Sequence, residues 1–147
     1  MGLRRVSFGP NHPIEEEAMS ERAKQGEQVR REVLGDFYVD RARSNSTEFS
    51  EPLQEFLNEN VWGLIWTRGI LERKTRSLVN LAILTATGKT KEVEVHTLGA
   101  LRNGCSPEEI REVFLQAAVY AGVPNALEAF KVAATVVEKF LGEKSGD

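Results

Sequence analysis

His96 is the residue of this chain with the most evident chemical potential. It is one of two histidines, and the other, His12, lies in a segment without apolar periodicity. If residues 90–103 are helical, Glu92, His96 and Asn103 follow one another at i, i+4 and i+11, near one face of the helix. Glu92 can then orient the imidazole and stabilise its charged form, which suits a general acid or base near neutral pH. A solvated Glu–His pair has the same spacing, so the residues alone leave both interpretations open.

A second polar line runs along the preceding segment, where Arg73, Ser77 and Asn80 follow at i, i+4 and i+7. Ser77 and Asn80 need hydrogen-bond partners if they are buried. A carboxylate ligand would supply such partners, and the planar fork of an arginine suits a carboxylate. The alternative is a solvated stripe with hydrogen bonds between helices. Further candidates for binding an anionic ligand, or for the walls of its pocket, are Arg68, Arg76, Arg102, Asn103, Trp66 and Tyr120.

The single cysteine, Cys105, excludes an internal disulfide and a Cys-x-x-Cys redox pair. It precedes a helix N-terminus, where the helix dipole can lower the pKa of a thiol, but no second cysteine is present to resolve an oxidised form. The two histidines lack a matching carboxylate motif, so we predict no metal site. No cofactor is expected either.

Two predicted helices must position these side chains. The segment from Leu71 to Thr87 would form a helix whose second half is apolar on almost every side, and Gly88 would end it. This pattern predicts a central buried helix. Near the start of residues 90–103, polar and apolar side chains alternate as in a strand. The segment ends, however, at Asn103-Gly104, which is typical of a helix C-terminus. The following run Ser106-Pro107-Glu108-Glu109 has the pattern of a capping box at the start of the next helix. We therefore predict that residues 90–103 are helical.

The remaining segments complete an all-α prediction. We predict a flexible N-terminal arm over residues 1–14 and a single domain over residues 15–147. Within it we expect a surface helix from Glu15 to Leu34, a turn-rich stretch, and a helix capped by Ser46 or Thr47 that reaches Trp62. A helix with one apolar stripe ends at Gly122, and the last helix, opened by Pro124, has two apolar faces that predict a subunit contact. The class is a compact bundle of about six helices that assembles as an oligomer.

Composition restricts the possible partners. The chain has 147 residues and a formal net charge of -3, with basic and acidic residues well mixed. Such a mixture predicts no basic surface patch that could bind nucleic acid. No apolar run approaches the roughly 20 residues of a membrane span, and the N-terminus has no signal-peptide pattern. We expect a cytoplasmic protein that contacts neither membrane nor nucleic acid and acts on a small molecule.

A set of short motifs spans about residues 27–140. It comprises Val33-Leu34-Gly35-Asp36, Val39-Asp40-Arg41-Ala42, Trp62-Gly63 with Trp66-Thr67-Arg68, Arg73-Lys74-Thr75-Arg76-Ser77-Leu78, His96 with Gly99-Ala100, Arg102-Asn103-Gly104, Glu108-Glu109-Ile110 and Ala118-Val119-Tyr120-Ala121-Gly122-Val123-Pro124. Together the motifs resemble the 4-carboxymuconolactone decarboxylase family. One departure is Gly69-Ile70-Leu71, where the family more often has Arg-Pro-Gly-Leu or similar.

The resemblance implies the alkylhydroperoxidase-like fold and a homo-oligomer, a trimer or a ring-like hexamer. In the peroxidase branch of that superfamily, a Cys-x-x-Cys ends four residues before the matching histidine. Those positions are Lys89 and Glu92 here, and Ser77 stands where that branch has an acidic residue. The decarboxylase branch therefore fits better than thiol-dependent peroxide reduction. Peroxide reduction and a non-catalytic helical assembly or binding subunit are the alternatives.

The activity implied by the resemblance is decarboxylation of 4-carboxymuconolactone to the β-ketoadipate enol-lactone, in aromatic catabolism through protocatechuate. The substrate is a butenolide that carries a carboxylate and an acetate arm on its γ-carbon. The electrons left by carbon dioxide can delocalise to the lactone carbonyl, so no cofactor is required. In this reading His96 donates the proton, Glu92 supports its charge, Arg73 or Arg76 holds the acetate arm, and Trp66 or Tyr120 supplies an apolar wall.

Overall fold

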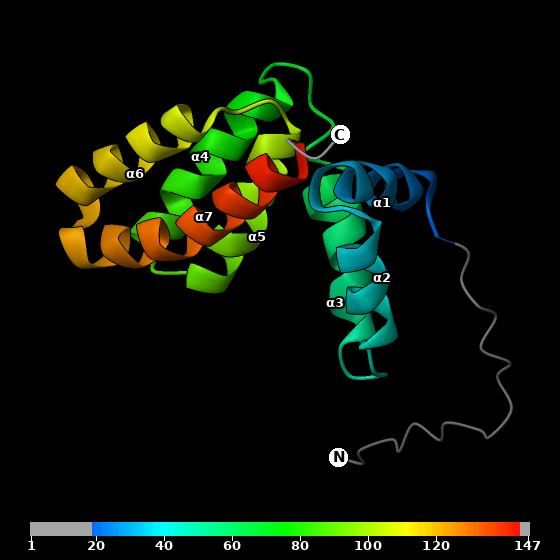
Figure 1. Ribbon diagram of the computed structural model, residues 1–147. Coiled ribbons are helices and arrows are strands. Elements are labelled where there is room, and N and C mark those ends of the chain that lie inside the picture. The colour runs from blue at the N-terminus through cyan, green and yellow to red at the C-terminus, as the bar shows by residue number, and fades with distance from the viewer. Residues whose placement is uncertain (1–18, 145–147) are drawn as a thin grey trace, which may run out of the picture.

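The computed structural model describes residues 19–144, and every regular element in that range is helical (Figure 1). In chain order the elements are α1 (Glu21–Leu34), α2 (Asp36–Ser44), α3 (Glu51–Phe56), the π-helix η1 (Leu57–Trp62), α4 (Arg73–Ala86), α5 (Thr90–Arg102), α6 (Pro107–Ala121) and α7 (Val123–Lys144). The predicted all-α class is confirmed. The predicted arm over residues 1–14, including His12, lies outside the described residues.

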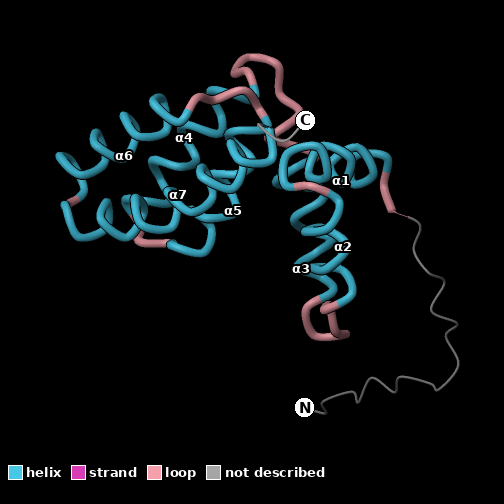
Figure 2. Tube along the Cα trace, viewed as in Figure 1, coloured by secondary structure: helices cyan, strands magenta, loops and turns pink. Residues whose placement is uncertain are grey.

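The helices are arranged as a four-helix body and a projecting N-terminal part (Figures 1 and 2). The body, α4 to α7, encloses a bundle core that we define by its buried residues Leu81, Val93, Ala100, Leu101, Cys105, Ile110, Phe114, Ala129 and Ala133. Helix α1 packs against η1 and α5, and the segment with α2 and α3 extends away from the body (Figure 1). A second group, the tryptophan cluster, consists of Val29, Val33, Leu34, Trp62 and Trp66. It fills the junction between the two parts.

Local signals near the predicted site form as expected. Residues 90–102 are helical, and the helix is followed by Gly104 with a φ of 88°. The Ser106 hydroxyl accepts a hydrogen bond from the Glu109 amide, and the Glu109 carboxylate accepts one from the Ser106 amide. This capping box starts α6 and thereby fixes where α5 must end. The predicted helix over residues 90–103 is confirmed.

The N-terminal half differs from the prediction of about six helices. The stretch after Gly35, expected to be rich in turns, contains the nine-residue helix α2. The helix expected to start at Ser46 or Thr47 starts at Glu51 instead, after a turn in which the Ser50 amide donates to the Thr47 carbonyl. Beyond Phe56 the chain widens into the π-helix η1, where the Gly63 amide donates to the Asn58 carbonyl five residues earlier. Seven α-helices and one π-helix therefore occur in the described range.

Two predictions about apolar faces also change. Helix α4 is not buried all round, since Val79 and Ile83 are about half-exposed on one side while Leu81 is fully buried on another. The two apolar faces of α7 do not separate into a core face and a subunit face. Residues from both faces pack against the bundle core, namely Phe130 and Val137 from one face and Val132, Val136 and Phe140 from the other. The helix is long enough to wrap its broad apolar surface against three neighbours.

Two close helix crossings hold the tryptophan cluster in place. A Cβ on Gly26 of α1 would lie 1.8 Å from the Asn58 carbonyl oxygen, and a Cβ on Gly63 would lie 2.5 Å from the Arg22 carbonyl oxygen. These glycines let α1 and η1 touch backbone to backbone. On the other side, Gly99 of α5 packs against Val33 of α1. Within residues 19–144, no helix is both long and apolar enough to cross a membrane.

Candidate active site

His96 lies in the second turn of α5 and stacks against two indole rings. Its ring centroid is 6.2 Å from that of Trp62, with the planes 7° apart, and 6.3 Å from that of Trp66, with the planes 21° apart. The two indoles stack on each other at 4.7 Å. The imidazole is partly buried and makes no hydrogen bond to any described residue. Its ring is thus held by aromatic packing, which leaves both nitrogens for other partners.

Burial governs the protonation of this imidazole. Removal from water lowers the pKa of His96 to about 4, and the negative charge of Glu92 opposes this shift only in part. Glu92 is exposed and forms no hydrogen bond with His96. In the chain alone the ring is therefore neutral at pH 7, with one nitrogen that donates and one that accepts. The predicted charge support from Glu92 acts through space and is the weaker of the two effects.

A pocket of about 170 Å³ lies beside Trp66. Its lining combines apolar side chains with one arginine and one amide: Ile65, Trp66, Leu71, Arg76, Val79, Asn80 and Ile83. Three residues predicted for substrate binding, Trp66, Arg76 and Asn80, thus meet in one hollow. His96 does not line the pocket, but it stacks on Trp66, which does. An apolar pocket with a few polar groups is typical of a small-molecule site.

Arg76 is the candidate anion-binding group of this pocket. Its Nη2 atom donates a 2.9 Å hydrogen bond to the Arg68 carbonyl, which fixes the guanidinium against the loop over residues 63–72. Its Nε atom is buried and has no partner among the described residues. No described carboxylate forms an ion pair with Arg76. Because an arginine fork binds carboxylates with two parallel hydrogen bonds, this arrangement suits a carboxylate ligand.

A neighbouring hollow of about 260 Å³ shares Trp66 and Leu71 with the pocket. It is lined in addition by Thr67, Arg68 and Arg73, among others. Arg73, however, forms an ion pair with Glu32 of α1. Its charge is therefore already balanced, whereas that of Arg76 is not.

Four other predicted residues lie away from the pocket. The Asn103 amide donates a 3.0 Å hydrogen bond to the Ser77 hydroxyl, and Ser77 is fully buried. These two residues thus satisfy each other and join α4 to α5, as in the helix-to-helix alternative. The guanidinium of Arg102 lies against Gly35 and donates to the Val33 carbonyl at 3.5 Å. Tyr120 is 82% exposed near the end of α6.

The thiol of Cys105 is in an unreactive setting. It is buried in the bundle core and donates a 3.6 Å hydrogen bond to the Lys74 carbonyl. Burial, with a smaller contribution from Glu109, raises the pKa of Cys105 to about 11. The lowering expected from the helix dipole does not prevail, so the thiol stays protonated at neutral pH.

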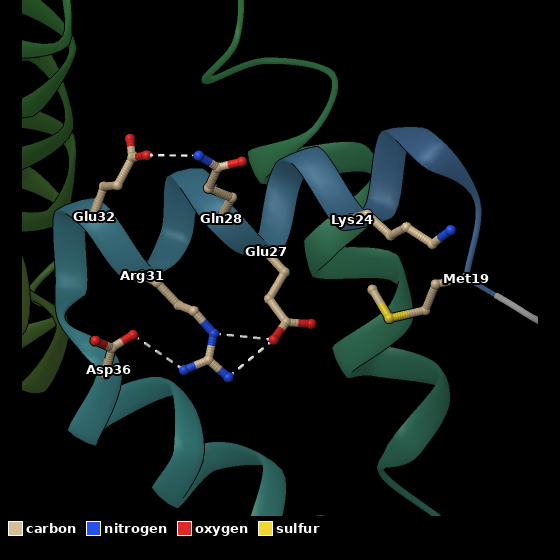
Figure 3. A pocket seen from close by; sticks show the side chains of 7 residues that line it. All are labelled: Met19, Lys24, Glu27, Gln28, Arg31, Glu32 and Asp36. Atoms are coloured by element: carbon tan, nitrogen blue, oxygen red, sulfur yellow. Dashed lines mark hydrogen bonds and ion pairs between the residues drawn. The ribbon is translucent and has the colours of Figure 1, made fainter.

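Another hollow, of about 510 Å³, lies along α1 (Figure 3). Its centre is Arg31, whose guanidinium contacts the carboxylates of Glu27, Asp36 and Asp40. None of the predicted site residues lines it. Each charged side chain of its lining already has an ion-pair partner, so the hollow offers no unpaired charge to a ligand. Within residues 19–144 no group of three or more histidine, cysteine or acidic residues is placed to hold a metal ion.

Sequence reasoning missed two parts of the site. The first is the π-helix η1, which ends at Trp62 and presents that ring to His96; π-helices often occur at functional sites. The second is the apolar rim of the pocket, formed by Ile65, Leu71, Val79 and Ile83. The spacing of Val79, Ile83 and Arg76 on α4 carried a signal for the rim, because all three fall on one helical face.

Comparison with known proteins shows the family of the chain. The profile of the Carboxymuconolactone decarboxylase family matches residues 51–135, which contain both the pocket and His96. The nitrosuccinic acid decarboxylase of Metarhizium robertsii is 44% identical over 108 residues, which are 74% of this chain and 76% of the relative. The 4-carboxymuconolactone decarboxylase of Acinetobacter baylyi is 39% identical over 116 residues, 79% of this chain and 87% of the relative. The chain belongs to the carboxymuconolactone decarboxylase family.

Proposed function

We propose that this protein is a carboxy-lyase that decarboxylates 4-carboxymuconolactone to the β-ketoadipate enol-lactone, without an external electron sink. The observation that carries the proposal is the conjunction of family membership with a pocket in which Arg76 has no acidic partner. The 4-carboxymuconolactone decarboxylase of Acinetobacter baylyi supports this choice of substrate because its alignment covers most of both chains.

Nitrosuccinic acid is the second candidate substrate, and the relative from Metarhizium robertsii favours it. The two molecules share one chemical feature. In each, the carbon that loses carbon dioxide also bears a carboxymethyl arm and an electron-accepting group, either the unsaturated lactone or the nitro group. When the carbon–carboxylate bond breaks, the electron pair passes into that group and a proton then adds to the resulting anion. The substrate itself thus supplies the electron sink.

The pocket residues match the steps of such a reaction. Arg76 binds the carboxylate of the arm, which stays on the product, with the fork geometry that carboxylates favour. Trp66, Leu71 and Ile83 surround the leaving carboxylate with apolar atoms, which favours its conversion to neutral carbon dioxide. Asn80, whose amide has no described partner, donates a hydrogen bond to the oxygen that gains negative charge.

His96 is the proposed proton donor. Its low pKa in the chain alone means that the ring must gain a proton when the substrate binds. A doubly negative substrate beside the indole cluster supplies the reason, because nearby negative charge raises the pKa of an imidazole. Because His96 does not line the pocket but stacks on Trp66, the substrate must extend past the Trp66 ring to receive this proton, after which the neutral imidazole is restored. Glu92 adds to the same effect from the solvent side.

The test is release of carbon dioxide by the purified protein from 4-carboxymuconolactone and, separately, from nitrosuccinic acid. We expect turnover of the lactone, with the nitro compound as the slower substrate. Faster turnover of nitrosuccinic acid would transfer the proposal to the second candidate. An assay with an organic hydroperoxide and a thiol reductant serves as the control for peroxide reduction, which the protonated Cys105 does not favour. If the protein turns over neither acid nor the hydroperoxide, the alternative of a non-catalytic assembly or binding subunit is favoured.

A further inference from the structure

Arg30 of α1 carries a buried charge that has no acidic partner. Only 4% of its surface is exposed. No described carboxylate forms an ion pair with it, and its buried Nε atom has no hydrogen-bond partner among the described residues. Removal from water lowers the pKa of the Arg30 guanidinium. Since a buried charge without a counter-charge costs free energy of folding, Arg30 calls for a role beyond packing.

The contacts of Arg30 lie at the point where one helix type gives way to another. Its Nη1 atom donates a 3.0 Å hydrogen bond to the side-chain oxygen of Gln54 and a 3.2 Å hydrogen bond to that of Asn58. Gln54 belongs to α3 and Asn58 to η1, so a single nitrogen atom spans the start of the π-helix. Because the guanidinium is planar and rigid, it holds both oxygens in a fixed arrangement.

Asn58 is the residue on which the wide turn of η1 depends. The Gly63 amide donates a 2.8 Å hydrogen bond to the Asn58 carbonyl five residues earlier, the spacing that defines a π-helix. On the α1 side, Gly26 lies against the same carbonyl, and Arg30, one turn after Gly26, binds the side-chain oxygen of Asn58. Helix α1 thus contacts both the backbone and the side chain of Asn58.

The wide turn determines where the Trp62 ring points. Trp62 is the last residue of η1, and its ring lies nearly parallel to that of His96. If the turn closed into an ordinary α-helix, every residue after it would rotate by one residue step, about 100° around the helix axis. Trp62 would then no longer face His96. Since π-helices are rare, we expect such a turn to persist only where neighbouring groups hold it.

Anion binding is the other role that a buried arginine could have. None of the three hollows described above includes Arg30 in its lining. Its charge is therefore not presented to a ligand in any of them. Both acceptors of its hydrogen bonds are neutral amide oxygens of the chain itself. The contacts thus favour a role in holding the π-helix.

We propose that Arg30 is a positioning residue, which holds Asn58 and the wide turn of η1 and so keeps Trp62 stacked on His96. The inference rests on the proposed function for the role of His96 as the proton donor. Arg30 itself does not touch the substrate. It acts on the reaction through the orientation of the Trp62 ring, against which the imidazole is held. A small misplacement of a reacting group is enough to slow a reaction by roughly tenfold or more.

Turnover by Arg30→Met tests this role. Methionine keeps much of the length of the arginine side chain but offers no donor to Asn58. We expect kcat for the preferred acid to fall by about tenfold or more. KM should change by less than about threefold, because Arg76 is untouched. A folded Arg30→Met variant with the kcat of the wild type would overturn the inference.

Arg31→Met is the matched control. Arg31 is the next residue of α1, but its guanidinium binds carboxylates of α1 and α2 instead of a residue of η1. Its variant removes the same charge from the same helix and should leave kcat unchanged. An equal fall of kcat in the two variants would show that the bond to Asn58 has no special role, and would also overturn the inference.

A double variant separates positioning from a general contribution to stability. Arg30→Met alone leaves the Asn58 oxygen buried without its donor, which should lower the free energy of unfolding. Arg30→Met combined with Asn58→Leu removes both polar partners, so part of that stability should return in urea unfolding. The kcat should stay low, because the bond that holds the wide turn is still absent. Recovery of kcat together with stability would overturn the inference, as would failure of both variants to fold.

A spectroscopic test needs no activity. Trp62 and Trp66 are the only tryptophans of the chain, and their stacked rings have centroids 4.7 Å apart. Two stacked indoles couple electronically and give a pair of positive and negative bands in the ultraviolet circular dichroism spectrum. This pair of bands should be strong in the wild type and in Arg31→Met, and much weaker in Arg30→Met. Bands of full strength in Arg30→Met, or the kcat of the wild type despite lost bands, would contradict the proposal.

The two readouts separate the inference from the function on which it rests. If the wild type releases no carbon dioxide but the bands are lost only in Arg30→Met, the proposed reaction fails and the control of the Trp62 ring by Arg30 stands. If the wild type is active and Arg30→Met keeps both its kcat and the bands, the positioning role fails and the reaction stands.

Discussion

His96 and Trp62 lie almost parallel, with their ring centroids 6.2 Å apart and their planes 7° apart. The relationship joins two distant parts of the sequence, because Trp62 ends the π-helix and His96 belongs to α5. It also explains why the imidazole is neutral in the chain alone. Two stacked indoles remove water from one side of the ring without offering a hydrogen bond to replace it.

Acid should destabilise the fold through His96. The pKa of His96 in the folded chain is about 4, below the ordinary value of 6.5, so the unfolded chain binds the proton more readily. The contribution is therefore fully present above pH 6.5 and is lost as the pH falls through 4. The loss should reach about 3 kcal/mol at most. Urea unfolding from pH 7.5 to 4 measures it, and His96→Gln should show a shallower decline. Equal declines in both proteins would refute the burial of the ring.

Arg76→Lys should impair substrate binding although it keeps the charge. Lysine cannot reproduce the two parallel hydrogen bonds, nor hold the Arg68 carbonyl in the same way. We expect kcat/KM for the preferred substrate to fall by about 10- to 100-fold, mainly through KM. Arg111→Ala is the matched control, since Arg111 is exposed on α6 and has only a 4.0 Å ion pair with Glu112. A similar loss in both variants would show that Arg76 has no special role.

Gly26→Ala should destabilise the protein more than a methyl group ordinarily does. The added Cβ would lie 1.8 Å from the Asn58 carbonyl oxygen, so α1 and η1 must move apart. The free energy of unfolding should fall by about 1–3 kcal/mol or more, as in other overpacked sites. Gly142→Ala is the control, because nothing lies within 4 Å of a Cβ there. Chemical denaturation of the two variants compares them directly, and unchanged stability of Gly26→Ala would refute the backbone contact.

Cys105 should be inert in the native protein. Its thiol is buried and its pKa is raised to about 11, so little thiolate forms at pH 8. Iodoacetamide should label it at a measurable rate only after unfolding, as mass spectrometry can follow. Decarboxylation should survive prolonged treatment with the reagent. Rapid labelling of the folded chain with loss of activity would reopen the thiol-dependent alternative.

The C-terminal half of the fold could be predicted because its signals are local. The capping box at Ser106 and Glu109 and the glycine after Asn103 act within a few residues, and they form as predicted. The π-helix was not predictable in this way. It depends on the close approach of Gly26 in α1 to the backbone around Asn58, a contact between positions far apart in sequence.

The residues of the candidate site likewise fall into those that local spacing could predict and those that depend on tertiary contacts. Arg76 and Asn80 were both predicted as substrate-binding residues, and both line the pocket. The predicted polar line of Arg73, Ser77 and Asn80 does not meet there, because only Asn80 of the three lines the pocket. Spacing could not tell which polar residues have partners on other helices. Ser77 and Asn103 bind each other, and Arg73 binds Glu32, because the tertiary packing of α4 against α5 and α1 brings those pairs together.

The rate of carbon dioxide release from 4-carboxymuconolactone and from nitrosuccinic acid, by wild-type protein and by His96→Ala, tests the proposed reaction most directly. Circular dichroism first confirms that the variant is folded. We predict turnover of at least one of the two acids by the wild type and a kcat lower by about 10²- to 10⁴-fold in the variant, because the proton donor is missing. Turnover of neither acid by the wild type, or equal turnover by the folded variant, would contradict decarboxylation with His96 as the proton donor.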